Sequence, residues 1–327
     1  MRLAIIGRTQ MLFDTALFLA EAGNKIAVIV TAPAAPESAR KEDDFKTLAQ
    51  RLDCPFFLTR SLNTPEVIET FQDLDLGISV NWISIVSQEH INCFSLGILN
   101  AHFGDLPRYR GNASPNWAIL QGENELVLSI HSMEGGLLDY GRVIIQNRFP
   151  IDEETTIAEV YEWAEKVLPN SFLKAIELLQ QDPQYAIKYA DPDDPNAFRC
   201  YPRLPEDGFI DWSASVESIH RLIRAAGPPF RGAYTYHLLN DTIRKLYVFK
   251  SRIVAKSTKD LAVAGHILKN DKEIGESWVK CGDGIMALQE CRYSNERENF
   301  MPGKRWKSIR MRLGIKVEDY FWNLRGH

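Results

Sequence analysis

Short apolar runs alternate with segments of helical apolar spacing along the first third of this 327-residue chain. Residues 3–6 form an apolar run that ends at Gly7, residues 11–20 carry apolar side chains at helical intervals, and residues 25–30 are apolar again. This order predicts strand, helix and strand, the opening of a parallel, doubly wound sheet. The order repeats through 56–58, 66–71, 76–80 and 96–100. We therefore expect an α/β fold with a Rossmann-like, mostly parallel sheet.

The pattern changes after residue 120. Residues 126–131 and 142–149 resemble an antiparallel pair of strands, and residues 155–180 have an apolar face at the period of a helix. The stretch Asp-Pro-Asp-Asp-Pro-Asn at 191–196 is rich in turn residues, which places a domain boundary between it and Pro205. The first domain is therefore expected to span residues 1–190.

A smaller, β-rich domain is expected over residues 203–294. Apolar spacing indicates one helix near 216–226, and short alternating runs indicate strands at 232–236, 243–249, 262–267, 278–281 and 285–288. Such a set fits an OB-like barrel. Residues 295–327 form a basic C-terminal stretch, and a charge run of this kind is typical of a solvated or interface-forming tail. Seven of its basic residues lie close together: Arg297, Lys304, Arg305, Lys307, Arg310, Arg312 and Lys316.

The charge balance argues against a dedicated nucleic-acid binder. Lys plus Arg number 38 against 43 Asp plus Glu, a net charge of −5, whereas such binders usually carry a basic excess. No stretch of eighteen apolar residues occurs, so we expect no membrane insertion. The N-terminus lacks the pattern of a leader peptide, which favours the cytoplasm. The five cysteines are far apart without CxxC spacing, which disfavours disulfides and a metal site. The turn after the first strand, residues 7–10, lacks the later glycines of a dinucleotide fingerprint.

Asn100 and His102 form the first candidate site. They follow an apolar run at the carboxyl end of a predicted strand, where ligands bind in open α/β sheets. Residues two apart on a strand share a face, so the amide and the imidazole should lie together. Taken alone, the pair fits a hydrogen-bonded structural contact equally well. The other histidines lack a comparable neighbourhood and are interpreted as structural: His90, His131, His220, His237, His266 and His327.

Three sequence blocks resemble the signature of folate-dependent formyltransferases. They are Asn100-x-His102, then Leu-Pro-x-Tyr-Arg-Gly at 106–111, then Leu-Asp-x-Gly at 138–141. The family includes the methionyl-tRNA, glycinamide ribonucleotide and sugar N-formyltransferases. The resemblance implies that Asn100, His102 and Asp139 are catalytic. One departure is Asp105: the transfer-RNA enzymes commonly read His-x-Ser-Leu-Leu-Pro, whereas residues 102–107 read His-Phe-Gly-Asp-Leu-Pro, which adds a carboxylate near the site.

The resemblance also implies how the substrates are held. The donor would be N10-formyltetrahydrofolate, with its pterin against Trp82, Ile83, Ile85 and Asp139 in segments 81–85 and 134–139. For Trp82, simple core packing is an equal alternative. Arg8, Arg108 and Arg110 are candidate substrate-binding residues, because arginine binds phosphate or carboxylate in a bidentate manner. Exposure to solvent is the alternative for loop arginines.

The reaction gives the three catalytic candidates physical roles. Attack of an amine on the formyl carbon creates an oxyanion, which the amide of Asn100 or the imidazole of His102 can stabilise as a hydrogen-bond donor. The amine must lose a proton while the folate nitrogen gains one, and His102 can relay it while Asp139 holds the imidazole. Whether His102 or Asp139 first accepts the proton stays open.

The second domain favours one class of acceptor. Residues 203–212, 223–225 and 230–236 resemble the C-terminal subdomain of formyltransferases, most closely that of the enzyme that formylates UDP-4-amino-4-deoxyarabinose in lipid A modification. A nucleotide-linked aminosugar is therefore the predicted acceptor, in surface polysaccharide or lipopolysaccharide biosynthesis. The alternatives are a methionyl-tRNA formyltransferase, a formyltetrahydrofolate hydrolase, and a non-catalytic ligand-binding protein of the same fold. A homodimer through the C-terminal strands is a further expectation.

Overall fold

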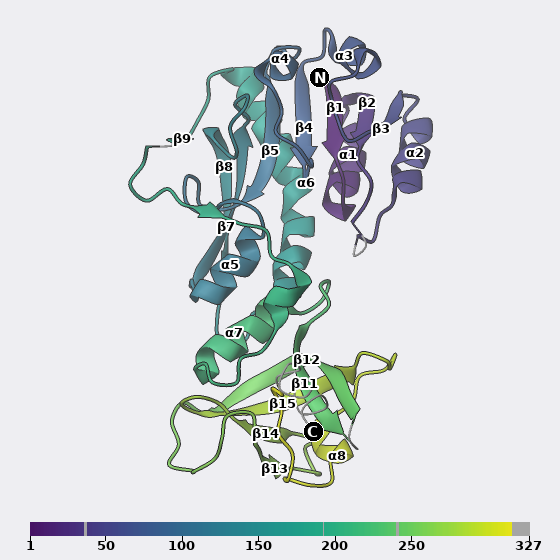
Figure 1. Ribbon diagram of the computed structural model, residues 1–327. Coiled ribbons are helices and arrows are strands. Elements are labelled where there is room, and N and C mark those ends of the chain that lie inside the picture. Colours follow the sequence, from purple (N-terminus) through teal and green to yellow (C-terminus); the bar gives the residue numbers. More distant parts are fainter. Residues whose placement is uncertain (36–37, 192, 240–241, 316–327) are drawn as a thin grey trace, which may run out of the picture. The chain divides into compact units, whose positions relative to one another are not determined.

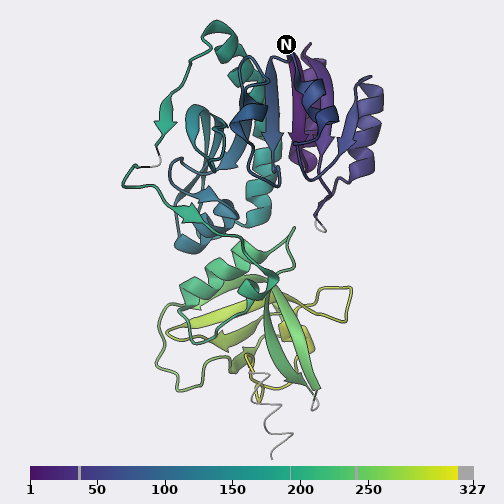
Figure 2. The ribbon, with the colours of Figure 1, turned by 45° about the horizontal axis from the view of Figure 1, so that its top comes forward.

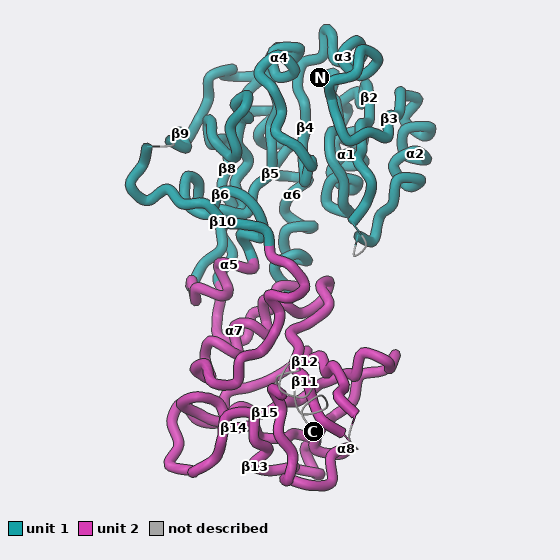
Figure 3. Tube along the Cα trace, in the orientation of Figure 1, with its two compact units in different colours: residues 1–115, 124–150, 159–202 teal, residues 116–123, 151–158, 203–327 magenta. Residues whose placement is uncertain are grey.

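The chain divides into two compact units. The computed structural model describes residues 1–327 apart from 36–37, 192, 240–241 and 316–327. Unit 1 comprises Met1–Pro115, Asn124–Pro150 and Glu159–Pro202, and unit 2 comprises Asn116–Glu123, Ile151–Ala158 and Arg203–His327 (Figure 3). The last change from unit 1 to unit 2 along the chain falls between Pro202 and Arg203. Two short segments from the first half of the sequence nevertheless belong to unit 2.

Unit 1 contains an eight-stranded sheet in the order β3-β2-β1-β4-β5-β7-β8-β9. The pairs among β1 to β5 are parallel, whereas β7, β8 and β9 pair in an antiparallel manner. This confirms the mostly parallel α/β fold predicted from the alternating pattern. The strands are β1 (Arg2–Gly7), β2 (Lys25–Thr31), β3 (Phe56–Leu58), β4 (Leu76–Val80), β5 (Ile98–Phe103), β7 (Glu125–Ser132), β8 (Gly141–Pro150) and β9 (Lys188–Ala190).

Helices cover both faces of this sheet (Figure 1 and Figure 2). Successive residues of β1 face opposite sides, so Leu3 and Ile5 join one core and Ala4 and Ile6 another. The first core includes residues of α1 (Gln10–Glu21), α2 (Glu42–Arg51) and α6 (Ile157–Gln181). The second includes residues of α3 (Pro65–Phe71) and α4 (Gln88–Ile91). The sheet is thus buried on both sides, which leaves its strand ends as the place for a site.

Unit 2 is built on a five-stranded antiparallel sheet in the order β11-β12-β15-β14-β13. The helix α7 (Val216–Ala226) buries Val216, Ile219 and Ile223 in the core of this unit. The predicted strand at 262–267 is wrong: its apolar residue Val263 is exposed, and the strand begins only at Ile267. The strands are β11 (Ala233–Leu239), β12 (Thr242–Ala255), β13 (Ile267–Asn270), β14 (Ser277–Lys280) and β15 (Ile285–Tyr293).

Part of the basic C-terminal stretch belongs to the core of unit 2. Trp306 and Leu313 are buried in it, and Phe300 pairs with Cys291 through a β-bridge. The short helix α8 (Pro302–Arg305) lies between Phe300 and Trp306 in the sequence. The intervening basic residues concealed this apolar spacing in the sequence. Lys316 and the rest of the predicted tail, 316–327, lie outside the described residues. In the part that the structure describes, no helix is long and apolar enough to cross a membrane.

Candidate active site

Asn100 and His102 lie at the carboxyl end of β5, as the sequence predicted. The antiparallel pairing of β5 with β7 sets Asn100 opposite His131 and His102 opposite Ser129. His102 and His131 are buried, whereas Asn100 is partly accessible. The register therefore adds a third polar side chain, His131, which the sequence pattern had left as structural. A strand partner cannot be recognised from spacing within one strand, and no other signal marked this histidine.

His102 is held between two acceptors. Its Nε2 lies 2.7 Å from the carbonyl oxygen of Tyr109, and its Nδ1 lies 3.4 Å from Oδ2 of Asp139. Because a carbonyl can only accept, Nε2 must carry a hydrogen. Nδ1 then faces the carboxylate, so an imidazolium formed here would donate to both partners. The structure thus brings His102 and Asp139 together from two stretches that are distant in sequence.

Asp139 is fixed by backbone as well as by histidine. The Gly111 backbone N–H donates to its Oδ2 at 2.8 Å, and its Oδ1 lies 3.7 Å from Nε2 of His131. Its φ of 57° lies in the left-handed region, which a non-glycine residue adopts only where the surroundings enforce it. The carboxylate is 9% exposed. It is therefore oriented before any substrate arrives.

The tautomer of His131 determines the orientation of the Asn100 amide. Burial lowers the pKa of His131 to about 4, although Asp139 opposes this, so the ring is neutral near pH 7. Its Nδ1 lies 3.0 Å and 3.2 Å from the carbonyl oxygens of Ser132 and Tyr140 and must carry the single hydrogen. Nε2 is then an acceptor. Because Nε2 lies 3.2 Å from Asn100 Nδ2, the amide donates one hydrogen to it and keeps the other for a ligand.

Gly104 and Asp105 shape the floor of the site. A Cβ at Gly104 would meet His102 Nε2, Arg108 O and Tyr109 O, each at 2.9 Å, so only glycine leaves room for the imidazole. Asp105 turns away from these groups: it accepts from Lys188 Nζ at 2.6 Å and from Gln146 Nε2 at 3.0 Å. Its carboxylate therefore connects the segment after β5 to β8 and β9.

The two loops predicted to hold a pterin lie side by side. The Gly136 N–H donates to the Val86 carbonyl at 3.0 Å, and the Gly135 N–H donates to Gln88 Oε1 at 2.9 Å. Ile83 and Ile85 are 36% and 59% exposed on the first loop. Leu137 is 42% exposed on the second. These loops therefore present apolar surface to solvent, an arrangement suited to a flat ring.

Trp82 packs partly against the second core of unit 1, and its buried Nε1 has no hydrogen-bond partner. Arg8 is occupied locally: its Nη1 donates to the Pro33 carbonyl at 2.7 Å. Arg110 lies on β6 (Arg110–Gly111), with Cζ 4.2 Å from the centre of the Tyr140 ring. Arg108 lies 5.5 Å from the ring centre of Tyr109. The structure thus brings Arg110 into the immediate surroundings of Asp139, whereas the contact found for the Arg8 side chain is with Pro33.

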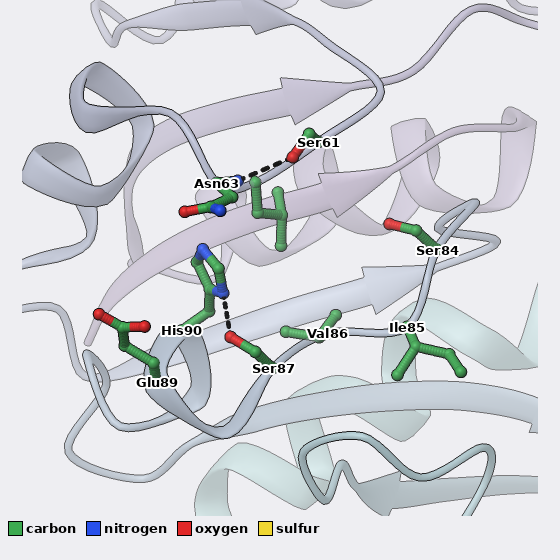
Figure 4. Close-up of a pocket in the computed structure, with 9 residues that line it drawn as sticks. Ser61, Asn63, Ser84, Ile85, Val86, Ser87, Glu89 and His90 are labelled. Atoms are coloured by element: carbon green, nitrogen blue, oxygen red, sulfur yellow. Dashed lines mark hydrogen bonds between the residues drawn. The ribbon is translucent and has the colours of Figure 1, made fainter.

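A cavity of about 280 Å³ is lined by residues 61–63 and by residues 84–87, 89 and 90 (Figure 4). Of the predicted site residues, only Ile85 lines it. His90 contributes a buried imidazole whose Nδ1 lies 2.5 Å from Ser87 Oγ and whose Nε2 has no partner. Figure 4 shows this ring directed toward Asn63. Within the described ranges, no cluster of His, Cys, Asp and Glu is placed to hold a metal ion.

An amide, an imidazole and a carboxylate thus meet at the end of a Rossmann-like sheet, a combination of groups that is suited to acyl-group chemistry. Residues 1–176 match the family described as formyl transferase, and residues 204–307 match the formyl transferase C-terminal domain. The chain belongs to the formyl transferase family, enzymes that transfer a one-carbon group. The resemblance seen in the three sequence blocks is thereby confirmed.

Relatives of two kinds are similar to the chain. A methionyl-tRNA formyltransferase from Geotalea uraniireducens is 26% identical over 304 residues, covering 91% of this chain and 92% of the relative. The structure of WlaRD, a sugar 3N-formyl transferase, is 17% identical with a TM-score of 0.63, covering 91% and 99% of the two chains. An N-formyltransferase structure from Helicobacter canadensis has the same identity and TM-score over 88% and 98%. At this identity, the structural likeness is one of fold.

Proposed function

We propose that the protein transfers a formyl group from N10-formyltetrahydrofolate to the primary amine of a nucleotide-linked aminosugar, for a surface polysaccharide or lipopolysaccharide. The observation that carries the proposal is the convergence of Asn100, His102 and Asp139 at the carboxyl end of β5, with His102 Nδ1 3.4 Å from the carboxylate. The alternative of a non-catalytic ligand-binding protein explains neither the oriented amide nor the buried His–Asp pair.

Each group has one task in this mechanism. The amine nitrogen attacks the formyl carbon, and the free amide hydrogen of Asn100 stabilises the oxyanion that forms. The attacking nitrogen then loses a proton to the His102–Asp139 pair, and the folate N10 gains a proton as its bond to the formyl carbon breaks. The Tyr109 carbonyl and the Asp139 carboxylate stabilise the imidazolium between them. The proton can go first to Asp139 or to Nδ1 of His102, the ring nitrogen left without a hydrogen, since the two groups lie 3.4 Å apart.

The donor is proposed for the paired loops. The WlaRD structure was determined in the presence of dTDP and 5-N-formyl-THF, and the Helicobacter canadensis structure with folinic acid and dTDP-3-aminofucose. In this chain Ile83, Ile85 and Leu137 offer apolar contacts to a pterin, and backbone groups of the same loops offer hydrogen bonds. Trp82 supports the first loop from beneath, and Asp139 closes the second loop next to the reacting group.

An aminosugar acceptor is supported by the net charge of −5 and by the ligands of those two structures. The rival acceptor is charged initiator transfer RNA. It is favoured by the methionyl-tRNA formyltransferase relative, and by the basic residues after position 295. A nucleic-acid acceptor would make turnover fall steeply with salt, since binding of the nucleic acid depends on phosphate neutralisation.

A homodimer stays a prediction, which light scattering would check.

Mass spectrometry of products from a panel of UDP-, dTDP- and GDP-linked aminosugars tests the proposal. We expect a mass gain of one formyl group with one sugar class, and loss of at least about 100-fold in turnover for Asn100→Ala. The control is Arg60→Gln, an exposed arginine of unit 1 away from these residues. Formylation of charged initiator transfer RNA, with no formylation of any sugar in the panel, would establish the alternative of a methionyl-tRNA formyltransferase. Undiminished turnover by His102→Ala would contradict the mechanism.

A further inference from the structure

Two arginines lie side by side next to the carboxylate of the site. The short strands β6 and β10 (Arg199–Cys200) pair in parallel, with Arg110 opposite Arg199 and Gly111 opposite Cys200. Residues at paired positions of neighbouring strands project from the same face. Gly111, which follows Arg110, donates its N–H to Asp139. The arginine pair therefore borders the proposed formyl-transfer site directly.

Aromatic rings cover the flat sides of both guanidinium groups. The Arg110 Cζ lies 4.2 Å from the centre of the Tyr140 ring, and the Arg199 Cζ lies 4.9 Å from that of Tyr201. A cation over a ring face is attracted by the ring and can still donate hydrogen bonds through its terminal N–H groups. These contacts therefore favour one position for each side chain and leave its Nη groups as donors for a ligand.

The positive charge of this pair is not balanced by an ion pair. Among the described residues, neither Arg110 nor Arg199 forms a salt bridge, and the buried Nε of Arg110 has no hydrogen-bond partner. Burial lowers the pKa of Arg110, Asp139 raises it, and the neighbouring charge of Arg199 lowers it again. Arg110 is partly buried and Arg199 is exposed, so an anion from solvent can reach the pair and relieve the repulsion between the two like charges.

We propose that Arg110 and Arg199 form an anion site that binds a phosphate of the acceptor's nucleoside diphosphate. The inference rests on the proposed function and adds Arg199, which no sequence pattern marked. Two outward-facing guanidinium edges match the oxygens of a diphosphate, each through paired hydrogen bonds. A phosphate held here is next to the strand that fixes Asp139, so binding the nucleotide presents the sugar amine to the reacting groups.

Steady-state kinetics of Arg199→Gln test this site with the sugar nucleotide that the panel identifies. We expect the acceptor KM to rise about 10- to 100-fold, from loss of a charge-assisted hydrogen bond. The kcat should change less than about threefold and the donor KM less than about twofold, because the phosphate is bound equally in the ground and transition states. Arg199→Lys should recover part of the affinity, and Arg60→Gln should behave as the wild type. A rise in donor KM alone would assign the arginines to the folate carboxylates and overturn the proposal.

Calorimetry with pyrophosphate, UDP and dTDP tests the site without turnover. Binding to the wild type that both Arg110→Gln and Arg199→Gln weaken about 10-fold or more supports the anion site, even if no aminosugar is formylated and the proposed function fails. Binding that neither variant changes, or that Arg60→Gln weakens equally, overturns it. Circular dichroism of each variant confirms that the fold is retained. If an aminosugar of the panel is formylated and neither arginine variant changes the affinity for the diphosphates, the anion site is refuted and the proposed function stands.

Discussion

The neutral tautomer of His131 fixes the Asn100 amide by accepting one of its hydrogens. Replacing His131 by Phe removes this acceptor, whereas Gln can supply an oxygen near the position of Nε2. We expect His131→Phe to lower kcat about 10-fold or more with donor KM nearly unchanged, because a misoriented amide no longer faces the oxyanion. His131→Gln should keep most of the wild-type rate. Steady-state kinetics against both substrates measure the difference.

A double-mutant cycle separates this positioning role from a general loss of structure. If His131 acts through Asn100, then His131→Phe should have little further effect in an Asn100→Ala background. If the double variant instead loses turnover by the product of the two single-variant losses, His131 does not act through Asn100.

The absence of a side chain at Gly104 leaves room for the Nε2 edge of the His102 imidazole. In Gly104→Ala, the added methyl group would overlap two backbone oxygens and the ring nitrogen. We expect turnover to fall at least about 10-fold and the unfolding free energy to fall by about 1–3 kcal/mol. Urea titration and product assays measure both. Gly227→Ala is the matched control, since the nearest atom to its added Cβ would be 3.6 Å away. Equal behaviour of the two variants would argue against crowding.

At the residue scale, the sequence predicted the proximity of polar side chains that lie on the same strand. Asn100 and His102 share a strand face, so their proximity followed from spacing alone. The approach of Asp139 to His102 was implied only by the family resemblance. His131 and Arg199 were missed because each is brought in by pairing between strands, and register depends on backbone hydrogen bonds that periodicity does not encode.

The helix α7 is anchored by backbone carbonyls of the segment Ile151–Ala158. Arg224 Nη1 donates to Thr155 O at 2.6 Å and to Asp152 O at 3.2 Å, and His220 Nε2 lies 2.9 Å from Glu153 O. We expect Arg224→Met to lower the unfolding free energy by about 1–3 kcal/mol, because a buried carbonyl loses its donor. Urea midpoints measure this change. The exposed control Arg231→Met should stay within about 0.5 kcal/mol of the wild type.

At the element scale, periodicity predicted the strands and helices that bury a continuous apolar face. The helix expected at 155–180 is confirmed as Ile157–Gln181, and the first five strands of the sheet occur where the apolar runs are. The strand expected at 262–267 failed because short apolar spacing does not require burial. The core residues Trp306 and Leu313 were hidden because the charges around them dominated the composition. Isolated apolar residues give no period to detect.

Two buried histidines make the whole molecule sensitive to acid. Burial lowers the pKa values of both His131 and His237 to about 4, from an ordinary 6.5. Between these values the unfolded chain binds more protons than the native one, so stability rises with pH and is lost as pH falls from 6.5 toward 4. Each histidine contributes up to on the order of 3 kcal/mol, fully lost only near pH 4.

Urea unfolding between pH 7 and pH 5 measures this loss. Fluorescence should show the midpoint falling with pH in the wild type, and less steeply in His131→Gln and His237→Gln. An unchanged slope in both variants would mean that other groups bind the protons.

The hydrogen bond from the Gly111 N–H to Asp139 connects the proposed acceptor-binding residue Arg110 with the proposed proton-transfer group through one peptide unit. The same two-residue strand carries an arginine on one side and steadies the carboxylate on the other. Any displacement of this strand alters the bond that steadies Asp139. If Arg110 holds the acceptor's phosphate as proposed, this strand sets the spacing between that phosphate and a carboxylate that is already in place in the empty enzyme.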